Sequence, residues 1–251
     1  MRSQNQTEQE NIKMESRVNE KVINMADNKL WLSYSSTSKK IPDAQAYESP
    51  GFFTYEIMKR LVDIVVGGLI FIAVLPVLAV CIIAVKLDSP GPVFFLQERT
   101  GKGGQRFRMY KFRTMLQNAA ELKEKYQHLN TLTYPDFKIP NDPRITRVGG
   151  FLRKTSLDEL PQLLNVLKGQ MSLVGPRPTS FCSSTYDLWQ TARLSVTPGI
   201  TGLWQVSGRA NVDFDERNRL DIEYIRNKSF WYDIKILFRT FFSVLERDGA
   251  T

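Results

Sequence analysis

The sequence predicts a mixed α/β, mostly helical domain that is attached to a membrane by one N-terminal helix, and three observations support this prediction. Residues 64–85 form an uncharged stretch of 22 residues, which is long enough to cross a bilayer as a helix. The chain that follows has the turns, short apolar strands and charged segments of a water-soluble domain with a small sheet. Residues 229–245 interleave aromatic side chains with lysine and arginine, a pattern typical of an amphipathic helix in the membrane interface.

The charge and composition of the chain limit the chemistry that it can carry. It holds 34 Lys+Arg against 26 Asp+Glu, which gives a net charge of +8. The favoured partners are therefore anionic: a phosphorylated substrate, an anionic lipid or a nucleic acid. One histidine and two cysteines exclude most zinc and non-haem iron sites and a disulfide framework. The mean hydropathy of −0.27 excludes a polytopic membrane protein.

The first 50 residues are rich in glutamine, asparagine, serine and charged residues, and they have no sustained hydrophobic period. Seven basic residues balance seven acidic ones, so the net charge of +8 belongs to residues 51–251. We expect residues 1–50 to form a disordered, neutral tail.

Residues 51–86 contain the uncharged stretch and are predicted to form the membrane helix. Lys59 and Arg60 precede the stretch and a run of basic residues follows it, so the positive-inside rule places both flanks in the cytoplasm. Pro76 lies in the middle, where it removes a backbone hydrogen bond. A re-entrant helix that kinks at Pro76 and returns to the same face satisfies both observations, whereas a spanning helix with a tolerated proline is the alternative. Asp63 is expected to pair with Lys59 or Arg60 at the interface.

Residues 87–251 are predicted to be the soluble domain, and its first segments are expected to form the sheet. A turn at 88–92 precedes a short apolar strand at 93–96. Residues 107–115 alternate basic with apolar or aromatic side chains, which suits either a strand or an interfacial segment. Residues 116–127 are charged and are predicted to be helical.

Residues 155–169 hold the most informative pattern in the chain. Their leucines occupy one face of a helix, and Pro161 in its first turn places Asp158 near the N-cap. The sequence from Ser156 to Glu159 also matches a capping box, and taken alone this structural role is favoured. The alternative is catalytic: one of two adjacent carboxylates acts as a nucleophile while the other binds a divalent cation.

Three arginines are candidates for binding phosphate groups. Arg153 lies just before the carboxylate pair, Arg177 lies in a Gly-Pro-Arg-Pro turn, and Arg209 ends a segment punctuated by glycines. A guanidinium held in a rigid turn is suited to bidentate binding of phosphate. Turns with exposed charges explain the same residues without any function, so both interpretations stay open on the residues alone.

Six motifs follow one another along residues 55–247. They are KRLVD, the apolar run with its proline, SPGPVFFLQERTG, FRMYKFRTM, DPRITRVGGFLRKTSLDELPQLLNVLKGQMSLVGPRP and TPGITGLWQVSGR. Together and in this order they resemble the bacterial sugar transferases, the monotopic phosphoglycosyl transferases that start the assembly of exopolysaccharide, capsule and O-antigen. The ordered set is far more specific than any single motif.

The resemblance implies an enzyme that transfers a phosphorus-containing group. The expected reaction moves a sugar-1-phosphate from a UDP-sugar to undecaprenyl phosphate and releases UMP, with glucose or galactose as the expected sugar. The resemblance implies that Asp158 is the nucleophile, which forms a phosphosugar-aspartyl intermediate, and that Glu159 is the ligand of Mg²⁺. It also implies a re-entrant membrane helix broken at a Ser-Pro pair, for which this chain has a Leu-Pro pair.

The resemblance extends to five further site residues. Arg153, Arg177 and Arg209 match arginines that lie near the phosphates. Asp221 and Asp233 match acidic positions that we assign to substrate binding.

The expected location is the cytoplasmic face of the bacterial plasma (inner) membrane. Residues 87–251 are then the cytosolic catalytic domain, with interfacial C-terminal helices in contact with membrane lipids. A homodimer is compatible with the sequence, and nucleic acid is no longer an expected partner. Two alternatives stay open: a non-catalytic, membrane-anchored basic protein that binds anionic lipid or nucleic acid, and an inactive scaffold of polysaccharide export.

Overall fold

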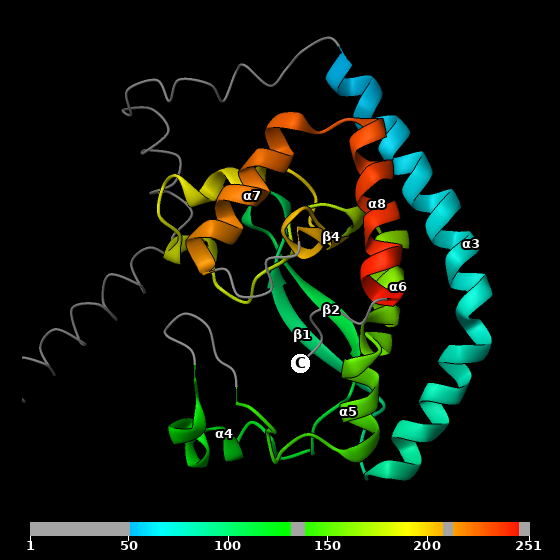
Figure 1. Cartoon of the computed structure of the whole chain (residues 1–251), viewed down its shortest axis with the longest axis vertical. Coiled ribbons are helices and arrows are strands. Elements are labelled where there is room, and N and C mark those ends of the chain that lie inside the picture. Colours follow the sequence, from blue (N-terminus) through cyan, green and yellow to red (C-terminus); the bar gives the residue numbers. More distant parts are fainter. Residues whose placement is uncertain (1–50, 132–138, 208–212, 246–251) are drawn as a thin grey trace, which may run out of the picture. The chain divides into compact units, whose positions relative to one another are not determined.

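The computed structural model describes residues 51–131, 139–207 and 213–245, so the predicted tail lies outside the described residues (Figure 1). Helices predominate among the described residues, and the strands form two small two-stranded sheets. The prediction of a mostly helical chain with little sheet is therefore confirmed. The helices are α3 (Gly51–Asp88), α4 (Leu122–Lys125), α5 (Arg147–Lys154), α6 (Leu163–Leu167), α7 (Phe214–Asn227) and α8 (Phe230–Leu245). The 3₁₀ turns are η1 (Lys102–Gly104), η2 (Gln127–Leu129), η3 (Leu157–Gln162), η4 (Ser183–Thr185), η5 (Gln190–Ser195) and η6 (Trp204–Val206).

Helix α3 is the long apolar helix that the uncharged stretch predicts. It has 38 residues, and its segment Thr54–Asp88 is long and apolar enough to cross a membrane. The helix bows along its length (Figure 1) but is helical throughout, so the predicted kink at Pro76 does not interrupt it. A proline frees one backbone carbonyl, and the packing of Val74 and Leu78 on either side keeps the flanking turns in place. The re-entrant path of this helix stays a prediction.

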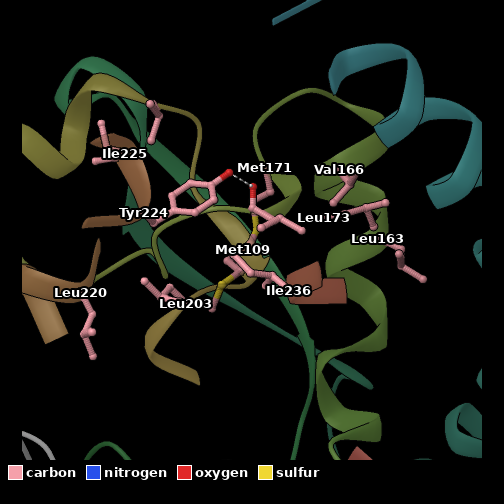
Figure 2. Packing of buried hydrophobic residues seen from close by; sticks show 12 residues of the cluster. Met109, Leu163, Val166, Met171, Leu173, Leu203, Leu220, Tyr224, Ile225 and Ile236 are labelled. Atoms are coloured by element: carbon pink, nitrogen blue, oxygen red, sulfur yellow. Dashed lines mark hydrogen bonds between the residues drawn. The ribbon is translucent and has the colours of Figure 1, made fainter. Parts of the chain in front are cut away.

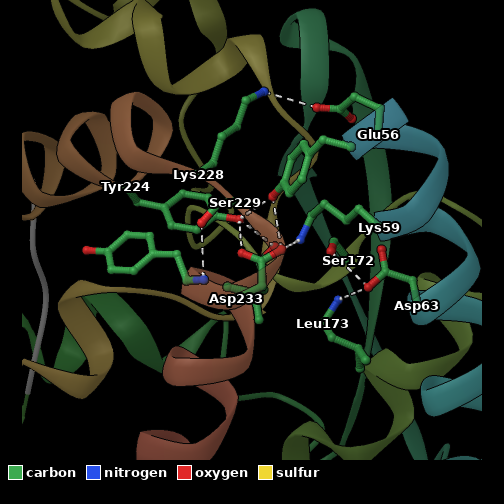
Figure 3. Close-up of polar contacts among 12 residues, drawn as sticks. Glu56, Lys59, Asp63, Ser172, Leu173, Tyr224, Lys228, Ser229 and Asp233 are labelled. Carbon is green, nitrogen blue, oxygen red and sulfur yellow. Dashed lines mark hydrogen bonds and ion pairs between the residues drawn. The ribbon is translucent and has the colours of Figure 1, made fainter. Parts of the chain in front are cut away.

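The N-terminal half of α3 is tied to the rest of its folded unit by buried polar contacts (Figure 3). Lys59 Nζ lies 2.6 Å from a carboxylate oxygen of Asp233 in α8. The guanidinium of Arg60 donates to the carbonyls of Val166 at 2.6 Å and Leu167 at 2.8 Å. Both carbonyls lie at the C-terminal end of α6, where a cation is favoured by the helix dipole, and that of Val166 also accepts from the Gly169 N–H at 2.9 Å.

Asp63 does not pair with Lys59 or Arg60, and the prediction of such a pair is wrong. Its carboxylate accepts hydrogen bonds from the Ser172 hydroxyl at 3.0 Å and from the Leu173 backbone N–H at 2.9 Å (Figure 3). Both basic residues have partners elsewhere in the fold, so a buried carboxylate on α3 is satisfied instead by the strand β3 (Ser172–Val174).

The C-terminal end of α3 is tied to the same folded unit. Asp88 accepts a hydrogen bond from the backbone N–H of Val148 at 3.1 Å, in the first turn of α5. Buried Arg113 donates to the carbonyls of Ser89 at 2.6 Å and Pro90 at 2.7 Å. Both ends of the long helix are therefore fixed to one folded unit.

Strands β1 (Phe94–Thr100) and β2 (Arg106–Phe112) form an antiparallel hairpin, which confirms a strand at the basic and aromatic motif. The two strands of the second sheet, β3 and β4 (Gly199–Thr201), are parallel. Asn165, which is completely buried, docks α6 on the hairpin: its amide oxygen accepts from Tyr110 N–H at 3.0 Å and its amide nitrogen donates to the Arg108 carbonyl at 2.8 Å. These two hydrogen bonds fix the position of α6, and of the carboxylate pair that precedes it, relative to the hairpin.

The main hydrophobic core lies where α6, β3, α7 and α8 meet β2 (Figure 2). Met109 contributes from β2, Met171 and Leu173 from the region of β3, and Tyr224 and Ile236 from α7 and α8. Because this core joins segments that are distant in sequence, it fixes the positions of β2, α6 and β3 relative to α7 and α8.

Two expected helices differ from the structure. Residues 116–127 are mostly turn, and only Leu122–Lys125 are α-helical. The helix predicted across 155–169 begins as the 3₁₀ turn η3, and α6 follows it. The aromatic segment forms α8, as expected, and exposes Trp231, Phe238 and Phe241.

Candidate active site

The carboxylate pair lies on η3, just after α5. Between the two elements Ser156 adopts a left-handed conformation with φ of 56°, which turns the chain sharply before Asp158. The expected capping box is not formed, because the Ser156 side chain makes no cap hydrogen bond and the Glu159 side chain reaches cations instead. The predicted capping box is therefore wrong, although both carboxylates lie in the first turn of a helical element, as expected.

Glu159 is held between two cations. Its carboxylate accepts from Lys111 Nζ at 2.7 Å, and Arg177 binds it with both terminal nitrogens, one of them at 3.1 Å. Burial raises the pKa of the Glu159 carboxyl, but the charges of Arg177 and Lys111 and their hydrogen bonds lower it by more. Glu159 is consequently ionised at all physiological pH values.

Asp158 is the less strongly paired carboxylate. Lys111 Nζ lies 4.0 Å from its Oδ2, beyond ordinary hydrogen-bond distance. Burial raises the pKa of Asp158, and the charge of Lys111 opposes this only in part. The two neighbouring carboxyls thus have pKa values shifted in opposite directions, an arrangement common where two acids have different tasks.

Two more arginines complete a cationic site around the pair. Arg153 Nε donates to the Thr114 hydroxyl at 2.9 Å, and the charge of Asp158 acts on this guanidinium. Arg99 donates to the carbonyl of Pro178 at 3.3 Å. Burial and the nearby charge of Arg177 lower the pKa of Arg99 to about 10, and the charge of Glu159 opposes this in part.

Sequence reasoning missed two of these cations, Lys111 and Arg99. Both lie in the β-hairpin, in the motifs FRMYKFRTM and QERTG. The alternation of basic and apolar residues in this strand could have indicated them. Such an alternation turns one set of side chains inward, and a buried lysine such as Lys111 requires an anionic partner.

Asp221 is buried behind the site and does not contact Asp158 or Glu159. It is 0% exposed and pairs at 2.6 Å with Arg193, whose guanidinium also donates to the carbonyl of Arg177 at 2.7 Å. Burial raises the pKa of Asp221 to about 7, although the charge of Arg193 lowers it in part. Within the described part of the chain, its other carboxylate oxygen has no hydrogen-bond partner.

The remaining predicted site residues lie elsewhere. Asp233 accepts hydrogen bonds from Tyr55 at 2.9 Å and Tyr224 at 2.7 Å and pairs with Lys59, so it belongs to the tether of α3 (Figure 3). Arg209 lies outside the described residues. Substrate binding by Asp221, Asp233 and Arg209 stays a prediction.

The donors of this site fit a magnesium ion that binds together with a phosphorylated substrate. The described residues contain no cluster of three or more His, Cys, Asp or Glu side chains, so they form no all-protein metal cage. Magnesium is commonly held by one or two carboxylates and by phosphate oxygens of the substrate, and Asp158 and Glu159 supply adjacent carboxylates in a site lined with cations.

The part of the chain that contains this site is similar in sequence to a known protein family. The family described as "Bacterial sugar transferase" matches residues 54–247. The chain is 46% identical over 203 residues to the "Undecaprenyl-phosphate galactose phosphotransferase" of Salmonella typhimurium, a match that covers 77% of this chain and 41% of that protein. It is 42% identical over 215 residues to the "UDP-glucose:undecaprenyl-phosphate glucose-1-phosphate transferase" of Escherichia coli, covering 80% of this chain and 43% of that protein.

A third relative is similar in length to the matched region. The chain is 39% identical over 199 residues to the "Exopolysaccharide production protein ExoY" of Rhizobium meliloti, a match that covers 76% of this chain and 87% of that protein. The chain thus spans less than half the length of the first two relatives and most of the third.

Proposed function

The chain belongs to the bacterial sugar transferase family, and we propose that it transfers a sugar-1-phosphate from a UDP-sugar to undecaprenyl phosphate as the first step of extracellular polysaccharide synthesis. The observation that carries the proposal is the Asp158–Glu159 pair, fixed among Lys111, Arg177 and Arg153 within the matched region. The names of the relatives favour glucose or galactose as the sugar.

In the first half-reaction, a carboxylate oxygen of Asp158 attacks the β-phosphorus of the UDP-sugar. A bond forms between Asp158 and this phosphorus, the bond between the phosphorus and the bridging oxygen breaks, and UMP leaves with that oxygen. An anion that attacks a phosphate meets like-charge repulsion, so the reaction requires cations around the transferred group. Lys111, Arg153 and Arg177 supply that charge at positions fixed before the substrate arrives.

In the second half-reaction, a phosphate oxygen of undecaprenyl phosphate attacks the same phosphorus. The phosphorus–carboxylate bond breaks, Asp158 is released as a carboxylate, and the product is an undecaprenyl diphosphosugar. Asp158 suits both steps because no strong ion pair competes for its attacking oxygen, whereas Glu159 is engaged by two cations.

Glu159 would hold Mg²⁺ next to the diphosphate of the substrate. When bound, the ion neutralises negative charge on the transferred phosphoryl group and on the leaving UMP. Arg177 and Lys111 orient the Glu159 carboxylate, so they also position this ligand.

We further propose that the protein is bound to the cytoplasmic face of the bacterial inner membrane by a re-entrant α3. Two ties to one folded unit, Lys59 with Asp233 and Asp88 with Val148 N–H, support a helix whose ends stay on the same side. The exposed aromatic residues of α8 support contact of that helix with membrane lipids.

Trapping of the covalent intermediate tests this function. The purified protein is incubated with Mg²⁺ and UDP-glucose or UDP-galactose labelled in the β-phosphate, without acceptor. We expect label on the protein with one equivalent of UMP, and removal of the label by undecaprenyl phosphate. Asp158→Asn should abolish both label and UMP, whereas Asp187→Asn, at a carboxylate outside the site, should keep them. Absence of label and of UMP with every UDP-sugar tested would overturn the proposal and favour a scaffold or a lipid-binding protein.

A further inference from the structure

Arg193 is a buried arginine in η5 that joins α7 to the loop of Arg177. Its guanidinium donates to the side-chain oxygen of Asn218 at 2.8 Å and to the carboxylate of Asp221 at 2.6 Å, both in α7. The same guanidinium donates to the backbone carbonyl of Arg177 at 2.7 Å. Arg193 is 6% exposed, and Asn218 and Asp221 are 0% exposed, so water does not compete for these hydrogen bonds. One buried side chain thus connects α7 to a residue of the carboxylate site.

The loop of residues 175–178 needs donors from other parts of the fold. Two of its four residues are prolines, which carry no N–H, whereas every residue contributes a carbonyl that must be satisfied when it is buried. The Pro176 carbonyl accepts from the Gly199 N–H at 2.9 Å, which is a backbone bond to β4. The Arg177 carbonyl accepts from the side chain of Arg193 instead. The place of the Arg177 backbone therefore depends on that side chain.

The carbonyl of Arg177 also influences where its side chain points. Arg177 precedes Pro178, and a residue before a proline is confined to extended backbone conformations. Because its ψ angle has little freedom, a rotation of the carbonyl turns the side chain with it. The guanidinium of Arg177 binds Glu159 through both terminal nitrogens, one of them at 3.1 Å. A two-point contact of this kind needs an accurate orientation, so loss of the bond from Arg193 should loosen the contact with Glu159.

Stability alone does not account for a charged pair at this place. Arg193 and Asp221 are both buried, and within the described part of the chain one Asp221 oxygen has no hydrogen-bond partner. A buried ion pair whose hydrogen bonds are incomplete commonly stabilises a protein no more than apolar side chains of the same volume. Asp221 instead holds the guanidinium of Arg193 in the orientation that reaches the Arg177 carbonyl.

We propose that Arg193 is a positioning residue of the transfer reaction. It acts through Arg177, whose guanidinium orients the Glu159 carboxylate next to the nucleophile Asp158. The inference rests on the proposed function, because it assigns a support to the cations of that reaction. Arg193 itself needs no contact with the substrate, and Asp221 has only an indirect part, since it holds Arg193.

The burst of UMP release without acceptor tests the inference. Its amplitude counts the folded, competent protein, whereas its rate constant reports the geometry of the site. We expect Arg193→Gln to lower the rate constant about 10–100-fold, the usual effect of removing a residue that orients a site residue. In an Arg177→Gln background the same substitution should lower it by less than about threefold, because the side chain that Arg193 positions is already absent. Effects that multiply would indicate a general loss of structure.

Arg144→Gln is the matched control for Arg193→Gln. Arg144 is 5% exposed, pairs with Asp142 at 2.6 Å and donates to one backbone carbonyl, that of Ala119, at 3.2 Å. It resembles Arg193 in burial and in the kinds of its partners, but these three residues lie outside the loop 175–178. We expect Arg144→Gln to lower the melting temperature or the amplitude of the burst and to leave its rate constant within about threefold of that of the unsubstituted protein.

Modification of arginines by phenylglyoxal gives a measurement that does not depend on activity. The reagent attacks accessible guanidinium groups, and a guanidinium held by a carboxylate reacts slowly. The side chain of Arg177 is 29% exposed, and that of Arg108, which is 72% exposed, serves as the internal reference. Peptide mapping should show faster modification of Arg177 relative to Arg108 in Arg193→Gln and no such change in Arg144→Gln. Asn218→Ala, which removes one contact of Arg193 with α7, should show the same change to a smaller degree and replaces Arg193→Gln if that variant does not fold.

Three results would contradict the inference: an unchanged rate constant in folded Arg193→Gln, an equal loss with and without Arg177→Gln, or unchanged modification of Arg177. Each of them leaves the burst of the unsubstituted protein intact and so leaves the proposed function standing. Absence of that burst would refute the proposed function, and the modification of Arg177 would then still decide whether Arg193 holds its loop.

Discussion

Lys111 is the residue on which the two carboxylates converge. It lies 2.7 Å from Glu159 and 4.0 Å from Asp158, so one ammonium group compensates both. We expect Lys111→Met to lower the rate of UMP release by about 10²–10³-fold, the usual effect of removing one preorganised charge from a transition state. Single-turnover measurement of UMP gives this rate.

Lys168→Met is the matched control for this substitution. Lys168 also lies beside β2, but its ammonium donates to the Tyr110 hydroxyl at 2.7 Å and does not pair with a described carboxylate. A rate for Lys111→Met within threefold of the control would show that Lys111 does not act on the transferred phosphate.

We expect Asp221 to make the free energy of unfolding depend on pH, without a direct part in the transfer reaction. Its pKa is about 7 in the folded chain against 3.8 for the ordinary carboxyl, so the folded state binds more protons between these values. Because unfolding then releases protons, the free energy of unfolding should fall as the pH rises from about 4 to about 7. Asp221→Asn, which cannot titrate, should lack this part of the slope when chemical denaturation in detergent is measured across the range.

If the free energy of unfolding had the same pH dependence in the unsubstituted protein and in Asp221→Asn, Arg193 would keep Asp221 ionised over the whole range from about pH 4 to about pH 7. The pair at 2.6 Å favours the charged form, whereas the complete burial of Asp221 and its unpartnered oxygen favour the protonated form. We expect the second influence to dominate, since a buried carboxylate needs more than one partner to replace its hydration.

At the level of the elements, the packing of α5 depends on a single glycine. A Cβ atom on Gly149 would lie 2.1 Å from the backbone oxygen of Thr114, which cannot move without shifting the end of the hairpin. We therefore expect Gly149→Ala to destabilise the protein by about 3 kcal/mol or more, as overpacking against backbone does. The measurement is thermal unfolding in detergent.

The adjacent glycine provides the control for this prediction. A Cβ atom on Gly150 meets only a methyl group of Ile145, at 4.0 Å, so Gly150→Ala should be neutral or stabilise the helix by up to about 1 kcal/mol. The prediction fails if both substitutions have the same effect on the melting temperature.

The elements that were predicted correctly are those with a strong local pattern. The apolar run became α3 and the aromatic segment became α8, because each carries its burial pattern within one continuous stretch. The partners of Asp63 could not be predicted, since Ser172 and Leu173 follow it by more than 100 residues and only the folded core brings them together. The capping box of Ser156 and Glu159 was predicted wrongly for the same reason. A capping box is a local interaction, and two distant cations outweigh it.

At the level of the whole molecule, the contacts of α3 argue against a helix that crosses the bilayer. Its segment Thr54–Asp88 has 35 residues and is about 52 Å long, which exceeds the hydrocarbon core of roughly 30 Å. The buried pair of Lys59 with Asp233 lies near one end and the contact of Asp88 with α5 at the other. A spanning path would have to break one of these ties or draw charged parts of the domain into lipid, and both are costly.

Labelling of single cysteines in oriented membrane vesicles can establish this topology. In a background without native cysteines (Cys81→Ala, Cys182→Ser), Thr54→Cys and Leu87→Cys place a thiol near either end of α3, where both side chains are exposed. We expect a membrane-impermeant maleimide to label both only when the cytoplasmic face is accessible, because both ends belong to one folded unit.

Cys182 of the unsubstituted protein is exposed and reports, in the same vesicles, which side of the membrane residues 87–251 occupy. Val80→Cys serves as the depth control and should stay unlabelled until detergent is added. Labelling of the two ends from opposite faces would contradict the re-entrant path, and the contacts at one end of α3 would then have to open in the membrane.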